Sequence, residues 1–199
     1  TVLPIIINEN QNILMIRSFV SELKGKLETF RTLNNNEIRK LNDIAQKYNI
    51  KYQNKHKLDL VDEILSNVDV IPNSIVLAQA AIESGWGKSR FAKEYNALFG
   101  EYTYDDSEGV IPLERENGDT HLIKAFSSYS NSVESYFDNI NSHYAYEDFR
   151  DIRNIMRKRN NFSNVNLLVN KLSTYAEDEN YIKTIRQVIK TNNFSIFDQ

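Results

Sequence analysis

The chain has 199 residues, of which 41% are apolar and 26% are charged, as in an ordinary globular protein. Its length suits one large domain, or one domain with a helical extension. A net charge of −3 gives no electrostatic reason to expect binding to nucleic acid or to an anionic membrane. Without cysteine the chain has no disulfides or thiolate metal sites. The three histidines lack the spacing of metal ligands, so we expect no metal and no other cofactor.

The first third of the chain predicts three helices. Apolar residues at steps of three and four predict an amphipathic helix over residues 8–30, with Ile13, Ile16, Val20, Leu23, Leu27 and Phe30 on its apolar face. A turn at residues 34–36 follows, and we expect Asn36 to cap the next helix, which runs to Tyr48. A shorter helix is predicted from Leu58 to Val68. We interpret this part as scaffold.

The stretch from Ile71 to Gly87 is the most informative part of the sequence. Every residue from Ile75 to Ile82 except Gln79 is apolar, which predicts a helix buried on most sides. Pro72 suits its first turn, and the Ser-Gly-Trp-Gly run after Glu83 should end it. Apolar surroundings would raise the pKa of Glu83, as a general acid requires. The alternative is an ordinary solvated carboxylate.

The periodicity changes after a short helix predicted over residues 89–95. Residues 99–126 contain four glycines or prolines among β-forming residues, and Asn117-Gly118 is a strong hairpin signal. We therefore predict strands near 110–115 and 120–126. Helices return at Asn131, which we expect to act as a cap with Glu134, and continue over 147–159, 163–173 and from Tyr181 to Ile189.

Two motifs carry a family resemblance: Ala78-Gln79-Ala80-Ala81-Ile82-Glu83-Ser84-Gly85-Trp86-Gly87 and Asn96-Ala97-Leu98-Phe99-Gly100. Their order and spacing resemble the glucosaminidase domain of glycoside hydrolase family 73, in its Bax-like branch, which is similar to flagellar peptidoglycan hydrolases. The resemblance is good from about residue 69 to 146 and weaker to about 181. It implies a mainly α, lysozyme-like α+β fold with a small β-hairpin lobe. We accordingly expect a helical extension over residues 1–68 and a catalytic domain over 69–199.

The resemblance also implies site residues. Glu83 maps onto the catalytic acid of the family. A second carboxylate is expected from the hairpin, where Glu108, Glu114, Glu116 and Asp119 are the acids, and Glu114 is preferred over Glu116. The acetamido group of the substrate is the alternative nucleophile. The segment from Ser173 to Tyr181 resembles a family motif, although Glu177 and Glu179 depart from it, and it makes Tyr175 the expected cleft tyrosine. Expected substrate contacts are Gln79, Trp86, Asn96, Phe99, Tyr146 and Tyr181, with Tyr144 a secondary candidate.

We therefore predict a peptidoglycan hydrolase that cleaves the β-1,4 bond after N-acetylglucosamine. The alternatives are a lytic transglycosylase and a non-catalytic cell-envelope binding or assembly module. The expected partner is the glycan strand, the expected location is the bacterial cell envelope (periplasmic or secreted), and a monomer is assumed. The sequence contains no recognisable signal peptide or membrane span. Because it starts at Thr1 without Met, the family resemblance suggests a fragment that has lost its targeting segment.

Overall fold

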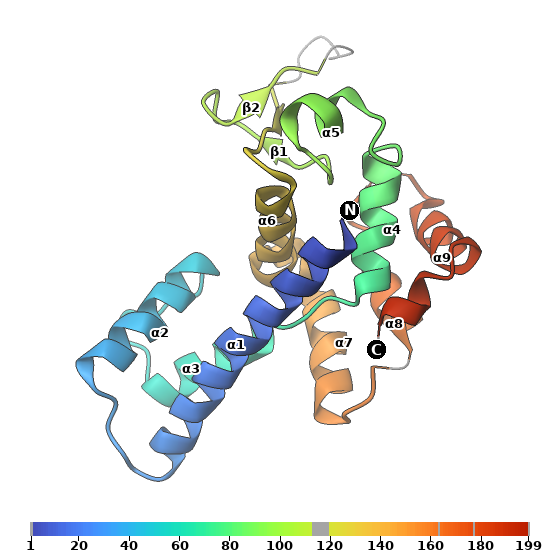
Figure 1. Cartoon of the computed structure of the whole chain (residues 1–199). Helices are drawn as coiled ribbons and strands as arrows, with labels where there is room; N and C mark the ends of the chain where they lie inside the picture. Colours follow the sequence, from blue (N-terminus) through green and yellow to red (C-terminus); the bar gives the residue numbers. More distant parts are fainter. Residues whose placement is uncertain (1, 113–119, 163, 177, 199) are drawn as a thin grey trace. The chain divides into compact units, whose positions relative to one another are not determined.

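The computed structural model describes residues 2–112, 120–162, 164–176 and 178–198. Most of these residues are helical, and a small antiparallel sheet of three strands interrupts the helices (Figure 1). The mainly α fold class with a small β element is therefore confirmed. The chain forms two compact units, each built from separate segments: Thr1–Ile7, Pro72–Phe137 and Lys183–Gln199 make the first, and Asn8–Ile71 and Asp138–Ile182 make the second. The expected division into 1–68 and 69–199 stays a prediction.

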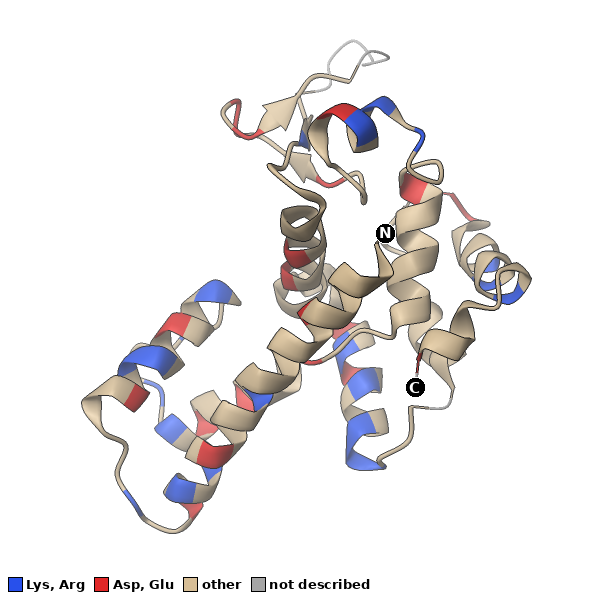
Figure 2. Cartoon of the chain, in the orientation of Figure 1, with Lys and Arg blue, Asp and Glu red and all other residues tan. Residues whose placement is uncertain are grey.

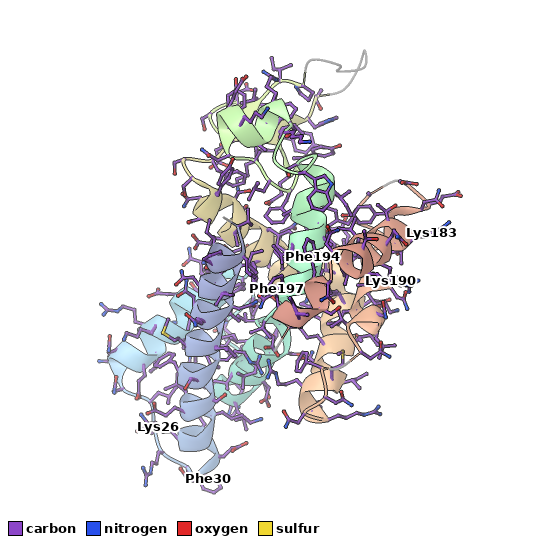
Figure 3. The ribbon with its side chains drawn as sticks, turned by 45° about the vertical axis from the view of Figure 1, so that its right-hand side comes forward. Lys26, Phe30, Lys183, Lys190, Phe194 and Phe197 are labelled. Carbon is purple, nitrogen blue, oxygen red and sulfur yellow. The ribbon has the colours of Figure 1, made fainter. Side chains whose placement is uncertain are left out.

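The first unit is organised around helix α4 (Asn73–Glu83). Its apolar run buries Ile75, Val76 and Ala78 completely, as the sequence predicts. The C-terminal 3-10 turn η2 (Phe194–Phe197) packs along α4 and lies beside it in Figure 3. The other helices of this unit are α5 (Arg90–Tyr95), the first part of α6 (Tyr129–Ser142) and most of α9 (Tyr181–Thr191).

The sheet has the order β1-β3-β2, with β1 at Tyr102–Thr103, β2 at Gly109–Val110 and β3 at Leu122–Lys124. Val110 pairs with Ile123, so the described part of the predicted hairpin is confirmed in its pairing, although its strands are shorter than predicted. Strand β1 was not predicted, and Tyr102 pairs with the same Ile123 from the other side. The predicted Asn117-Gly118 turn lies outside the described residues.

The second unit is helical and contains α1 (Leu3–Glu28) from residue 8 onward. It also holds α2 (Asn35–Lys47), α3 (Lys57–Asn67), the end of α6, the 3-10 turn η1 (Tyr144–Tyr146), α7 (Glu147–Lys158) and α8 (Val165–Val169). Helix α3 packs on α2 and α7, and α7 packs on η1 and α8. These contacts bury the apolar faces of amphipathic helices, including Leu41, Ala45, Leu60, Ile64, Phe149 and Leu168.

A buried ionic cluster stabilises the second unit. The side chain of Asp69 is fully buried, and it forms ion pairs with Arg157 at 2.5 Å and with Arg17 at 3.3 Å. Arg153 is also fully buried and donates to the backbone oxygens of Asp69 and Asn67 and to Oδ1 of Asn141. Burial lowers the pKa of the Arg153 guanidinium, while the negative charge of Asp69 acts against that shift. This cluster ties α1 and α7 to the segment that follows α3.

Three local predictions were wrong. Helix α1 ends at Glu28, and Phe30, expected on its apolar face, adopts a positive φ of 57° and is 99% exposed (Figure 3). The cap of α2 is Asn34 instead of Asn36, because Asn34 forms a complete capping box with Glu37. Asn131 lies inside α6, and its backbone N–H donates to Oγ of Ser128, the residue before the helix.

Candidate active site

Helix α4 begins without a side-chain cap of its own, because the residue before it is Pro72. Asp198, from the end of the chain, supplies the missing acceptor. Its carboxylate accepts from the backbone N–H of Ser74 at 2.8 Å and from the Ser74 hydroxyl at 2.6 Å. Asn73 adds a bond from its side-chain amide to the carbonyl of Phe197 at 2.6 Å. A carboxylate at a helix N-terminus is favourable, so the C-terminal segment fixes the start of the helix that carries Glu83.

Glu83 is the last residue of α4 and its only charged residue. Figure 2 shows this as a single red segment at the end of an otherwise uncharged helix. The side chain is half-buried. The structure therefore places Glu83 at the C-terminal end of the buried helix, where its side chain is partly accessible to solvent.

The turn after Glu83 has a left-handed backbone, which is unfavourable only for its non-glycine residue, Trp86. Gly85, Trp86 and Gly87 have φ values of 56°, 59° and 73°, which place three consecutive residues in the left-handed region. The backbone N–H of Trp86 donates to the carbonyl of Ala81 at 2.7 Å. The Ser84 hydroxyl donates to the Ala80 carbonyl and accepts from the N–H of Gly87. The turn thus leaves the Trp86 side chain 56% exposed.

The second motif, residues 96–100, lies beside the C-terminal end of α4. Gly100 has a φ of 63°, and a Cβ atom at this position would lie 3.7 Å from Oε2 of Glu83. Asn96 also has a positive φ and ends α5, while its side-chain amide donates to the carbonyl of Phe126 at 2.9 Å. The structure therefore brings the two motifs together at the carboxyl group of Glu83.

Two of the expected substrate contacts lie in the core of the first unit. Gln79 is completely buried, and its Oε1 accepts from the hydroxyl of Tyr136 at 2.5 Å. Phe99 is 2% exposed, and its ring stacks on that of Tyr136 with centroids 4.2 Å apart. Because both side chains are buried, Gln79 and Phe99 support the site from within the core in this structure. Their contact with substrate stays a prediction.

The sequence analysis missed two residues that lie next to the motifs, Tyr136 and Glu101. Tyr136 follows Val133 at a helical step of three, so the spacing of α6 contained a signal for it. Glu101 follows Gly100, and its carboxylate accepts from the Ser135 hydroxyl at 2.9 Å. No sequence pattern connects Glu101 to Ser135, because the two are 34 residues apart.

The expected tyrosines gather in the second unit. The rings of Tyr175 and Tyr181 are stacked at 5.8 Å with an angle of 3°, and the ring of Tyr146 lies 6.1 Å from that of Tyr175. Tyr146 and Tyr181 are buried, whereas Tyr175 is half-buried. Tyr144 is 81% exposed. Of this group, Tyr175 therefore combines a fixed ring with access to solvent.

The preferred second acid, Glu114, lies outside the described residues, as do Glu116 and Asp119. Glu108 is described, and its carboxylate lies 3.8 Å from the ammonium group of Lys124 on the neighbouring strand. The same lysine lies 3.4 Å from the Ser135 hydroxyl. An exposed ion pair of this kind contributes at most about 1 kcal/mol to stability. Glu108 is thus a surface residue that forms a weak ion pair beside the sheet.

Neither a metal nor a membrane site emerges from the described ranges. In them no group of three or more His, Asp or Glu side chains is placed to hold a metal ion. None of the helices described there has the length and apolar character needed to cross a membrane.

Comparison with known proteins identifies the class to which this fold and site belong. Residues 58–194 match the family model Glucosaminidase, described as mannosyl-glycoprotein endo-beta-N-acetylglucosaminidase. The match covers more than half of the chain, which therefore belongs to the glucosaminidase family. The resemblance to glycoside hydrolase family 73 is confirmed.

Individual relatives agree with this assignment. The chain is 32% identical to Protein bax of Escherichia coli K12 over 178 residues, which are 88% of this chain and 61% of the relative. It is 35% identical over 92 residues, 41% of its own length, to the peptidoglycan hydrolase FlgJ of the same organism, of which it covers 29%. The chain thus spans less than two thirds of the length of these curated relatives.

A solved structure shares the fold. The catalytic domain of the autolysin Auto from Listeria monocytogenes is similar with a TM-score of 0.50 at 18% identity. The similarity covers 89% of this chain and 96% of the other.

Proposed function

We propose that this chain is a peptidoglycan hydrolase that cleaves the β-1,4 bond after N-acetylglucosamine, with Glu83 as the general acid. The observation that carries the proposal is the position of Glu83. It is the single charged residue of a buried helix, at the C-terminal end of that helix, and it lies against Gly100 of the second motif. Family membership and the similarity to the peptidoglycan hydrolase FlgJ support peptidoglycan as the substrate. The cell envelope is the corresponding location, with glycan strands as the partner.

The proposed reaction begins with proton transfer from the carboxyl group of Glu83 to the glycosidic oxygen as the bond to that oxygen breaks. Water then adds to the sugar carbon and loses its proton to a base. Glu114 is the proposed base, and the acetamido group of the substrate is the alternative participant. Tyr175 is proposed to orient that acetamido group through its hydroxyl.

Mass analysis of digests of purified peptidoglycan tests this function. Reducing N-acetylglucosamine ends, absent from a digest with Glu83→Gln, are the expected products. Reducing N-acetylmuramic acid ends would assign the other glycosidic bond. Anhydro ends would identify a lytic transglycosylase, and intact glycan with tight binding would identify a non-catalytic envelope module.

The second acid is tested by comparing Glu114→Gln with Glu116→Gln on the same substrate. Loss of activity only in Glu114→Gln, with partial recovery on adding azide, is the result expected for a base at Glu114. Loss only in Glu116→Gln would move the assignment to that residue. Full activity in both variants would favour the acetamido-assisted route.

A further inference from the structure

Residues 194–198 form a segment that contacts both ends of α4. The segment contains η2, which packs on α4 and lies beside it in Figure 3. Asn193 separates it from α9 with a positive φ of 53°, a conformation that asparagine adopts more readily than most residues. The first and last residues of the segment make different kinds of contact with the helix.

The contacts at the start of α4 are hydrogen bonds. The carboxylate of Asp198 accepts from both the backbone N–H and the hydroxyl of Ser74. The side-chain amide of Asn73 donates to the carbonyl of Phe197. Ser74 is completely buried, so these bonds lie where a hydrogen bond is stronger than in water. Bonds from two adjacent residues to one segment restrict both the translation of the helix along its axis and its rotation.

The contacts at the other end of α4 are apolar. The ring of Phe194 lies 6.5 Å from that of Trp86, at an angle of 51°. Phe194 also lines an apolar pocket together with Ala81 and Ser84, which stand on either side of Glu83 in the sequence. Because Phe194 lies by the end of α4 and Asp198 by its start, the segment runs antiparallel to the helix. It therefore joins the first turn of α4 to the turn that follows Glu83.

A displacement at the first turn of α4 reaches Glu83 because an α-helix moves as a rigid element, each turn being hydrogen-bonded to the next. The helix has 11 residues, which at a rise of 1.5 Å per residue makes it about 16 Å long. A misplacement of about 1 Å at a reacting group, caused by a change far from the chemistry, can lower a rate about 10²-fold. Glu83 can therefore depend on Asp198 without touching it.

We propose that Asp198 is a positioning residue for the reaction, an inference that rests on the proposed function. Through Ser74 it fixes where α4 lies along its axis, and so where the carboxyl group of Glu83 meets the bond that is cleaved. Phe194 completes the arrangement by packing on Trp86, directly after the acid. In this role Asp198 acts through the helix and needs no contact with substrate.

Steady-state kinetics of Asp198→Ala on soluble peptidoglycan fragments test this role. We expect kcat to fall about tenfold or more and KM to change less than about twofold, because substrate contacts remain while the acid is displaced. Asp198→Asn keeps an oxygen that can accept from the N–H of Ser74, so it should recover part of the rate.

Asn34→Ala is the matched control. It removes the cap of another helix, α2, which lies in the second unit and carries none of the proposed catalytic residues. Loss of this cap should lower the midpoint of urea unfolding, as loss of the Asp198 contact should. It should nevertheless leave kcat within about twofold of the parent, because α4 keeps its position.

Trp86 provides a second readout that does not depend on turnover, because it is the only tryptophan in the chain. Acrylamide quenching of its emission should increase in Asp198→Ala, as Phe194 moves away from the indole ring, and should stay at the parent value in Asn34→Ala. Ser74→Ala removes only the hydroxyl and keeps the backbone N–H. It should give the same pattern with smaller changes, and it replaces Asp198→Ala if that variant does not fold.

Three results would overturn the inference. These are the parent kcat in folded Asp198→Ala or Ser74→Ala, an equal loss of kcat in Asn34→Ala, and quenching of Trp86 that is unchanged in Asp198→Ala. Failure of the proposed function is distinguishable. In that case the parent itself produces no new ends from peptidoglycan, while the response of Trp86 to Asp198→Ala persists.

Discussion

Oε2 of Glu83 lies 3.7 Å from the point that a Cβ atom of residue 100 would occupy, and Gly100 holds that position with a φ of 63°. This contact joins two motifs that are separated in the sequence by the whole of α5. It also explains why the second motif ends in glycine, because other residues rarely adopt this conformation. The carboxyl group of Glu83 is therefore packed against the loop that holds Gly100.

Replacing Glu83 by Gln is expected to lower turnover at least about 10²-fold, because general acid catalysis supplies about that much. Cell-wall clearing by purified protein is the measurement. Activity of the parent should also fall on the alkaline side as the acid loses its proton, and any residual activity of the variant should lack that limb. Glu94→Gln, at an exposed position on α5, is the control. A folded Glu83→Gln protein with the parent rate would remove Glu83 from the reaction.

Gly100→Ala is expected to destabilise the chain by about 1–2 kcal/mol, the cost of a left-handed backbone for a residue with a Cβ. Relief of that strain would displace the loop from Glu83, so kcat should fall about tenfold or more. Urea unfolding and cell-wall hydrolysis measure the two effects. Gly25→Ala is the matched control, because residue 25 is helical and has open space around it. That control should gain about 0.5–1 kcal/mol.

Tyr136→Phe should cost about 1–3 kcal/mol in the free energy of unfolding, because it removes the donor of a buried hydrogen bond to Gln79. The same change at Tyr144, which is 81% exposed, should have an effect within about 0.5 kcal/mol. Chemical denaturation of both variants provides the comparison. Equal free energies of unfolding for the two variants would mean that the hydrogen bond between Tyr136 and Gln79 makes no net contribution to stability.

Asp69→Asn is expected to lower the free energy of unfolding by about 3–5 kcal/mol, because it leaves buried arginine charge without its partner. Asp148→Asn provides the contrast. Its carboxylate is 73% exposed and pairs with Lys171 at 2.8 Å, so its loss should cost no more than about 1 kcal/mol. Denaturant unfolding should therefore separate the variants clearly, and similar midpoints would show that the buried cluster is not a stabilising centre.

Asp198 should make stability depend on pH in a defined direction. Burial raises the pKa of its carboxyl group, and the hydrogen bonds from Ser74 oppose that shift. The folded chain then binds this proton more readily than the unfolded chain. The contribution of Asp198 to the free energy of unfolding should therefore fall as pH rises from about 4 through the raised pKa, and stay level above it.

The difference between the parent and Asp198→Asn, measured by urea unfolding from pH 4 to 7, should show this slope. Asp106→Asn, at an exposed position, should leave the profile of the parent unchanged. A parent-minus-variant difference that is flat, or that increases with pH, would contradict the assigned direction.

Sequence alone was sufficient for the helix that carries Glu83 and for the turn that ends it. An apolar run of this length has few stable environments other than a buried helix, and the glycines around Trp86 supply the left-handed turn. The motifs likewise identified the family. These inferences depend on neighbouring residues, whose spacing is fixed by covalent geometry.

Only the tertiary structure showed that Asp198 caps α4 from 124 residues away, that Tyr136 binds Gln79, and that Gly100 approaches Glu83. It also showed the exposure of Phe30, where local periodicity predicted burial. Each of these depends on which distant segments pack together. Helical periodicity and residue type specify that a face is apolar, but the partner of that face is selected by the free energy of packing the whole chain.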